Sequence, residues 1–333
     1  MRSKKNVETT KLKEGETLKK EFNNYVEMAK SAVDWTLFCS YQLKPDFSEG
    51  AHKILQLPSM QIASTNMSGG IMFDYVIPEG CITFSVIKKI SQKACIDQMK
   101  LKTGMIVITD DTKRYNFMCS DSVELFDISL NQNADSLLID KLKNAVDKYY
   151  LDSDQKLITL IRGIINTYAE DTRLDTNTSR KIEKEITKTM LQLLEVQEVQ
   201  IPHFTKSQKI ALEIKQKLFK HMDGKMTIAS LAKEYTISSK SLQNAFRSLF
   251  DLTPNQFTRL LKLNLVHHEL IHLNSTDTSV MKIAQKWGFA HMGRFSKYYT
   301  ELFGENPSIT LKNINPIVDG MHTHCVERKE EIH

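Results

Sequence analysis

Residues 280–307 read VMKIAQKWGFAHMGRFSKYYTELFGENP, and a similar pattern of apolar residues and proline occupies residues 227–254. The separation is 52 positions in the first half of the pattern and 53 in the second half. The matched pairs are Leu231 and Ile283, Ala232 and Ala284, Tyr235 and Trp287, Ile237 and Phe289, Leu242 and Phe295, Phe250 and Phe303, and Pro254 and Pro307. This repeat predicts two helix-turn-helix units in one chain. Two such units suit a long, periodic polymer, and DNA is the obvious one.

Basic residues are concentrated in the part of the chain that contains the repeat. The 333 residues include 45 Lys and Arg against 40 Asp and Glu, a formal net charge of +5. Between residues 205 and 316 there are 16 Lys and Arg against 8 Asp and Glu, so the remainder is net negative. Such an excess is typical of a phosphate-binding surface, although a solvated lysine-rich surface would have the same composition.

The first copy of the repeat predicts a helix with two unlike faces. Thr227 can N-cap a helix over residues 228–235, and Ser238 or Ser239 can cap the next helix. On that second helix the spacing i, i+3, i+4 and i+7 defines a buried stripe of Leu242, Ala245, Phe246 and Leu249. The same spacing on the opposite side defines what we call the first reading face: Lys240, Gln243, Asn244 and Arg247. Asn and Gln pair with adenine edges, and Arg and Lys pair with guanine edges.

The second copy predicts a similar helix with fewer base-reading groups. Its buried stripe is Phe295, Tyr298, Tyr299 and Leu302. The residues left facing outward form what we call the second reading face: Met292, Gly293, Ser296 and Lys297, with His291 and Arg294 at its flanks. Glycine offers no side chain and methionine only an apolar contact, so we expect weaker base discrimination here. Arg294 is expected on a phosphate rather than on a base.

A helix is predicted between the two units. Thr253 is a good N-cap, Pro254 suits the first helical position, and the apolar spacing continues to about Leu273. About 20 residues span roughly 30 Å, which is close to the roughly 34 Å between successive major-groove faces of B-DNA. The two reading faces are therefore expected to reach adjacent major grooves, or to bend the DNA in doing so.

Residues 207–313 resemble the DNA-binding domain of the AraC/XylS family of bacterial transcription regulators. The family signature is carried by Val280, Ile283, Ala284, Gly288, Phe289, Phe295, Tyr299, Phe303, Gly304 and Pro307. The first copy departs from it at Asp251, where the family usually has glycine, but aspartate tolerates the left-handed conformation of a helix C-cap. Residues 287–308 are most similar to the subgroup that contains regulators of ethanolamine utilisation. The resemblance implies promoter DNA and RNA polymerase as partners, and usually activation.

The N-terminal part is expected to have an α+β organisation. Short strand-like runs separated by turn signals extend from about Trp35 to Leu130, which predicts a small antiparallel barrel or sandwich. Helical spacing follows, and its last stripe is Ile182, Ile186, Met190, Leu193 and Leu194. This stripe suits either a helix that pairs with a partner or one packed on its own barrel. The resemblance implies a cupin-like barrel with dimerising helices, hence a homodimer.

Composition changes along the chain predict the domain limits. We expect a disordered N-terminus over residues 1–20 and a regulatory and dimerisation domain over 21–200. A linker over 201–206, the DNA-binding domain over 207–316 and a charged tail over 317–333 complete the chain. The five scattered cysteines, and the absence of a hydrophobic leader or membrane-length apolar run, favour a cytoplasmic protein. The family resemblance implies a bacterial protein associated with the nucleoid.

The N-terminal part offers few candidates for chemistry. His52 is the only histidine in residues 1–200, whereas a cupin metal site needs two or three, so we predict no catalytic residue, metal or cofactor. A pocket for a small-molecule effector is the more useful hypothesis. The aromatic residues that could line it, or simply fill the core, are Phe73, Tyr75, Phe84 and Phe117. Two alternatives stay open: a dimeric regulator without effector control, and a cupin metalloenzyme fused to a DNA-binding domain.

Overall fold

The computed structural model describes residues 12–32, 36–45, 49–91, 93–97, 99–146, 148–168, 173–195, 204–220, 227–271 and 279–312. The chain forms two compact units. The first unit contains residues 1–37, 48–68 and 73–202, and the second contains residues 38–47, 69–72 and 203–333. Residues 1–11 of the predicted N-terminal segment, the first half of the predicted linker at 201–203 and the predicted tail at 317–333 lie outside the described residues.

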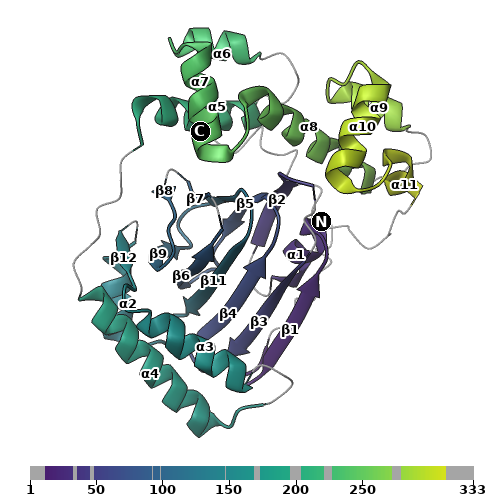
Figure 1. Ribbon diagram of the computed structural model, residues 1–333. Helices are drawn as coiled ribbons and strands as arrows, with labels where there is room; N and C mark the ends of the chain where they lie inside the picture. The colour runs from purple at the N-terminus through teal and green to yellow at the C-terminus, as the bar shows by residue number, and fades with distance from the viewer. Residues whose placement is uncertain are drawn as a thin grey trace, which may run out of the picture. The chain divides into compact units, whose positions relative to one another are not determined.

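Two antiparallel sheets make up the β-structure (Figure 1). The larger sheet has the order β1-β3-β4-β11-β6-β9-β12. Its strands are β1 (Thr17–Phe22), β3 (Gly50–Gln56), β4 (Met60–Met67), β11 (Val123–Leu130), β6 (Ile82–Ile90), β9 (Met105–Asp110) and β12 (Tyr149–Leu151). The smaller sheet has the order β2-β5-β10-β7-β8. Its strands are β2 (Thr36–Gln42), β5 (Ile71–Val76), β10 (Tyr115–Cys119), β7 (Ala94–Ile96) and β8 (Met99–Lys100).

Of the two predicted alternatives, a barrel or a sandwich, the closed barrel is therefore wrong, while the alternation of strands on which both were based is confirmed. The described strands form two separate sheets. Each sheet has two edge strands that do not pair with each other, so neither sheet closes on itself. A barrel needs its first and last strands to pair, and short-range alternation of apolar residues carries no information about that pairing.

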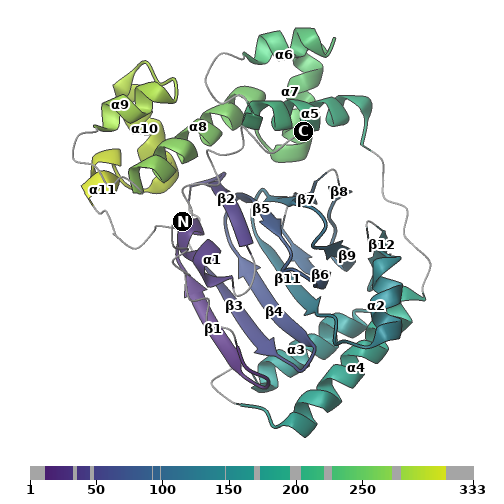
Figure 2. The same ribbon diagram turned by 180° about the vertical axis from the view of Figure 1, so that it is seen from behind.

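Three helices cover one face of the larger sheet: α2 (Ser136–Lys143), α3 (Lys156–Tyr168) and α4 (Thr176–Leu194) (Figures 1 and 2). The Asp175 side chain caps α4 by accepting from the backbone N–H groups of Asn177 and Thr178. The stripe from Ile182 to Leu193 is buried in the same core as Ile62, Phe84 and Ile128 of the sheet. Of the two alternatives for this stripe, packing on the chain's own sheet is the one observed.

Strand β1 corrects the predicted disorder for residues 17–20, which pair with β3. Phe22 is fully buried, whereas Lys19 and Glu21 form an exposed ion pair. β1 lies at an edge of the larger sheet, where charged side chains on the outward side protect the open edge from pairing with other chains. Because an edge strand of this kind is rich in lysine, its composition is similar to that of a disordered tail, which explains the wrong prediction. Helix α1 (Tyr25–Ser31) follows, capped by Asn24.

The second unit is helical apart from its strand segments. Its helices are α5 (Lys206–Lys220), α6 (Ile228–Glu234), α7 (Ser239–Phe250), α8 (Pro254–Ile271), α9 (Val280–Lys286), α10 (Met292–Phe303) and α11 (Pro307–Lys312). The pairs α6–α7 and α9–α10 lie towards opposite ends of α8 (Figure 1). The two-copy arrangement predicted from the repeat is thus observed.

Gly50 of β3 is packed closely against Phe22 and the backbone of Asn66. A methyl group at this position would lie 2.1 Å from Phe22 Cε2 and 2.6 Å from the Asn66 carbonyl oxygen. We expect Gly50→Ala to lower the free energy of unfolding by about 2–3 kcal/mol, because the Phe22 ring and a backbone strand must both move. Chemical denaturation of the full-length chain measures this change. Gly163→Ala on α3, where no atom lies within 4 Å, is the matched control and should stabilise the protein by about 0.5–1 kcal/mol. Equal effects of the two substitutions would contradict the packing described.

Candidate functional site

The first helix-turn-helix consists of α6, a four-residue turn and α7. Thr227 and Ser230 form a capping box at the start of α6, and the Ser238 side chain accepts from the Ser241 backbone N–H at 3.1 Å to cap α7. Both predicted helix starts are confirmed. The α7 helix ends at Asp251, which adopts the left-handed conformation with φ 57°, as expected for a residue that replaces glycine at this cap.

The two faces of α7 differ as predicted. Leu242, Ala245, Phe246 and Leu249 are buried. Phe246 packs against Phe250 and Phe257 with ring centroids 5.1 and 5.7 Å away, which joins α7 to α8. All four residues of the first reading face, Lys240, Gln243, Asn244 and Arg247, are exposed. The fold thus presents a continuous polar helix face without using any of its residues in the core.

The second helix-turn-helix, α9 and α10, is positioned by a chain of hydrogen bonds. His267 Nδ1 lies 2.7 Å from the Tyr299 hydroxyl, which donates to Thr310 Oγ1 at 3.0 Å. Burial raises the pKa of Tyr299 above its ordinary value, so the hydroxyl keeps its proton and donates. The His267 ring stacks on Phe303 at 4.1 Å between ring centroids. The end of α10 is thereby held against both α8 and α11.

The second reading face is only partly free of the core. His291, Gly293, Arg294 and Lys297 are exposed, whereas Met292 and Ser296 are half-buried. Met292 packs against the core formed by α8, α9 and α10, so less of it faces outward than the spacing predicted. Lys297 lies 3.8 Å from Glu301 one turn later, an exposed contact that contributes little stability. Tyr298, predicted to be buried, is half-buried beneath the Arg259 guanidinium at 4.0 Å.

Helix α8 joins the two helix-turn-helix copies as predicted and begins at Pro254. It has 18 residues and so spans roughly 27 Å. Sequence reasoning missed Asn264, which is fully buried on this helix. Its side chain accepts from the Gln42 backbone N–H at 2.7 Å and donates to the Gln42 carbonyl at 2.8 Å. An asparagine in the middle of an apolar helix stripe was the available signal, although its partner 222 positions away was not predictable.

Comparison with known proteins agrees with this geometry. Residues 231–313 match a family of helix-turn-helix domains. An XylDLEGF operon transcriptional activator of Pseudomonas putida is 30% identical over 109 residues, which are 33% of this chain and 34% of that protein. The probable thc operon regulatory protein of Rhodococcus erythropolis is 31% identical over 94 residues, 28% of each protein. The chain carries a DNA-binding domain of the AraC/XylS family.

The match covers about a third of the length of these relatives, so it concerns the AraC/XylS domain. The relatives are transcription regulators rather than enzymes. Among solved structures, the AraC-like transcriptional activator CuxR has a TM-score of 0.43 at 10% identity, covering 76% of this chain and 96% of that one. A probable AraC family regulator from Rhodopseudomonas palustris has a TM-score of 0.31 at 28% identity, covering 32% and 99%.

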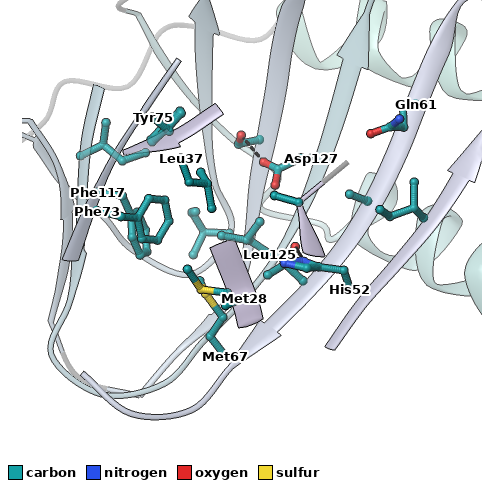
Figure 3. A pocket seen from close by; sticks show the side chains of 17 residues that line it. Met28, Leu37, His52, Gln61, Met67, Phe73, Tyr75, Phe117, Leu125 and Asp127 are labelled. Atoms are coloured by element: carbon teal, nitrogen blue, oxygen red, sulfur yellow. Dashed lines mark hydrogen bonds between the residues drawn. The ribbon is translucent and has the colours of Figure 1, made fainter. Parts of the chain in front are cut away.

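The first unit contains a cavity of about 90 Å³ beside the larger sheet (Figure 3). Of the four aromatic residues predicted to line a pocket, Phe73, Tyr75 and Phe117 line this cavity. Phe84 does not, because it is fully buried on the opposite face of β6, in the core beneath the helices. The expectation for Phe84 is thus corrected: neighbouring strand residues point to opposite faces, and the sequence did not indicate which face of β6 was which.

Besides Tyr75, the titratable side chains of His52 and Asp127 line the cavity, and sequence reasoning overlooked Asp127. His52 is buried, its Nδ1 lies 2.9 Å from Thr65 Oγ1, and burial lowers its pKa to about 4. Asp127 was not predicted as a site residue; burial raises its pKa to about 6, although the Ser85 hydroxyl donates to it at 2.5 Å. Among the described residues no three His, Cys, Asp or Glu side chains come together as metal ligands. No helix in the described ranges has the length and apolar character needed to cross a membrane.

The turns of the two helix-turn-helix copies provide a test of their equivalence. Thr236 has a positive φ of 51°, and the equivalent residue in the second copy, Gly288, has a φ of 82°. A β-branched residue is strained in this conformation, whereas glycine adopts it readily. We expect Thr236→Gly to stabilise the AraC/XylS domain by about 1 kcal/mol, and the reciprocal Gly288→Thr to destabilise it by about 1–2 kcal/mol. Thermal unfolding of the two variants measures both signs. A loss of stability in both would mean that the two turns are not equivalent.

Proposed function

We propose that this protein is a sequence-specific transcription regulator that binds promoter DNA through two adjacent major grooves. The observation that carries the proposal is the first reading face: four exposed side chains suited to base edges, on a helix whose opposite stripe is buried. The second reading face lies at the other end of α8, and its exposed His291, Arg294 and Lys297 suit phosphate contacts.

The N-terminal unit is proposed to regulate this DNA binding, with the cavity as the site of a small-molecule effector. Support for effector control comes from the cavity itself, which combines aromatic side chains with a few polar groups, as ligand sites commonly do. Activation through RNA polymerase and the formation of a homodimer stay predictions from the family resemblance. The domain limits at 21–200 and 207–316 are part of the same proposal.

Selection of bound duplexes from a random DNA pool, using the full-length chain, tests this function. The expected result is enrichment of a bipartite site whose two elements lie about one helical turn apart. Salt-sensitive binding to every duplex, without enrichment, would show that the two helix-turn-helix copies supply only affinity for the DNA backbone. This result would contradict sequence-specific regulation.

Asn244 is proposed to contact a base. We expect Asn244→Ala to weaken binding to the selected duplex by about 1–3 kcal/mol and to relax the preference at one base position, because the bidentate amide is lost. Binding to duplexes altered at each position measures this loss. Gln216→Ala, an exposed amide on α5, is the matched control and should change nothing. Uniform weakening over all sequences would show that Asn244 contacts no base.

Arg294 is proposed to contact a phosphate. We expect Arg294→Ala to weaken binding to all duplexes and to lower the slope of log K against log salt by about 0.9, which corresponds to one phosphate contact. Titrations at several salt concentrations give the slope. Lys181→Ala on α4 removes an equal charge and should leave the slope unchanged. A changed base preference in Arg294→Ala would instead identify Arg294 as a base contact.

A further inference from the structure

The cavity in the first unit has one wall made by the larger sheet, and the strand register shows how that wall is built. His52, Thr65, Leu125 and Ile87 lie in one row across β3, β4, β11 and β6. Ile54, Ala63, Asp127 and Ser85 lie in the next row across the same strands. All eight residues line the cavity. Asp127 therefore lies inside this wall, directly beside Ala63 of β4 and Ser85 of β6.

This wall of the cavity contains an acidic side chain and no basic side chain that is charged at pH 7 among the described residues. Asp127 is a carboxyl group whose only described hydrogen bond is the one from Ser85, and no lysine or arginine is among the described residues that line the cavity. His52 does not supply a positive charge, because burial keeps its pKa near 4 and the ring is neutral at pH 7. Its Nε2 makes no hydrogen bond of ordinary geometry, although the Met28 carbonyl lies near enough to favour the protonated ring slightly. The wall thus holds an acidic group without a basic partner.

The facing wall is aromatic. Phe73 and Tyr75 come from β5 and Phe117 from β10, in the smaller sheet. The Phe73 ring lies 5.1 Å from Phe117 and 5.9 Å from Tyr75, measured between ring centroids. Figure 3 shows Phe73 and Phe117 side by side, across the cavity from Asp127 and His52. Aromatic faces attract cations through the negative potential of the ring, and they pack well against apolar groups.

We propose that this cavity binds a small organic amine: an apolar, preferably aromatic, body placed between Phe73 and Phe117, with a protonated amino group at Asp127. A carboxylate across from aromatic rings is the arrangement that recognises such a cation. A carboxylate ligand is excluded on the same grounds, because it would place a second negative charge beside Asp127 with no described cation to balance it. The inference deepens the proposed function, since it names the chemical class of the effector.

Calorimetric titration of the full-length chain at pH 7.5 tests the proposal with compounds of matched shape. The probes are 2-phenylethylamine, 2-phenylethanol and 3-phenylpropionate, together with cyclohexylamine and 4-phenylbutylamine to vary the size. We expect at least one amine to bind, with the matched alcohol roughly tenfold or more weaker and the carboxylate not binding. A carboxylate that binds as tightly as the amine, or failure of all three amines, would overturn the proposal.

Two variants locate the bound amine. Asp127→Asn should weaken amine binding by roughly tenfold to a hundredfold and leave the weak binding of the alcohol unchanged. Asp154→Asn, an exposed carboxylate of the same unit, is the matched control and should bind as the unaltered chain does. Since burial disfavours the charged form of Asp127, the Asp127→Asn variant is expected to melt no lower than the unaltered chain at pH 7.5.

Phe117→Leu tests the aromatic wall independently and should weaken amine binding severalfold. Unchanged amine binding in both cavity variants would place the amine elsewhere and reject the site.

The DNA-binding proposal is measured separately in the same preparation. The full-length chain is titrated with the selected duplex in the absence of any amine. Binding of the duplex without binding of an amine rejects the ligand inference alone. Binding of an amine without any selected duplex rejects the proposed function and leaves the cavity an amine site.

Discussion

The DNA-binding unit depends on the sharing of one helix by two hydrophobic cores. Near its start, α8 contributes Phe257, whose ring lies 5.7 Å from Phe246 and 5.1 Å from Phe250. Further along, Leu263, Val266 and Leu270 of α8 are buried with Phe295 and Tyr299 of the second copy. Burial of each such side chain contributes about 1.5–3 kcal/mol, so neither copy can turn about α8 without losing several of these contacts. The spacing of the two reading faces is consequently a property of the folded unit, and does not have to be established on the DNA.

The two faces of the larger sheet also have different roles: one forms the main hydrophobic core and the other lines the cavity. Side chains alternate along each strand, so Phe84 and Ile128 enter the core beneath the helices while Ser85 and Asp127 enter the cavity. The first face is continuous and apolar, and its burial beneath α3 and α4 stabilises the unit. Because that face supplies the stability, the other face can carry polar groups in a partly open cavity. A ligand site on one face of a sheet therefore does not require any gap in the main core.

The sequence was most informative where structure is determined locally. Caps at Thr227 and Ser238, the start of α8 at Pro254 and the left-handed Asp251 depend on a few neighbouring residues, and all four are confirmed. The repeat added long-range information, since one copy could be aligned on the other. The first reading face followed from helical spacing alone, and its exposure is confirmed, while its contacts with DNA stay a prediction.

The features that were missed depend on contacts between distant residues. Closure of the sheet, the inclusion of β1 and the side on which Phe84 lies are all decided by strand pairing, which spacing along one strand does not reveal. Asn264 was missed for the same reason, because its partner comes from β2. Asp127 was overlooked because it lies between Phe126 and Ile128. In an alternating strand, an acidic residue at such a position is expected to face the solvent. Alternation predicts that such a residue faces away from the main core, which it does, but it faces a partly open cavity between the sheets and not the solvent.

The energetics of Asp127 give this difference a functional meaning. Its pKa of about 6, against an ordinary 3.8, means that the folded protein at pH 7 holds a carboxylate that is disfavoured by up to about 3 kcal/mol relative to the unfolded chain. This penalty is fully present above pH 6 and disappears as the pH falls towards 3.8, because the folded state takes up the proton first.

An occupant with a positive charge would lower the pKa of Asp127 and remove part of the same penalty at neutral pH. Since a ligand that binds only the folded state stabilises it, the carboxylate would couple occupancy of the cavity to the stability of the sheet that forms its wall. A serine or alanine at position 127 would avoid the penalty but would also remove this coupling. A cation bound in the cavity, as proposed, would offset part of this cost in stability.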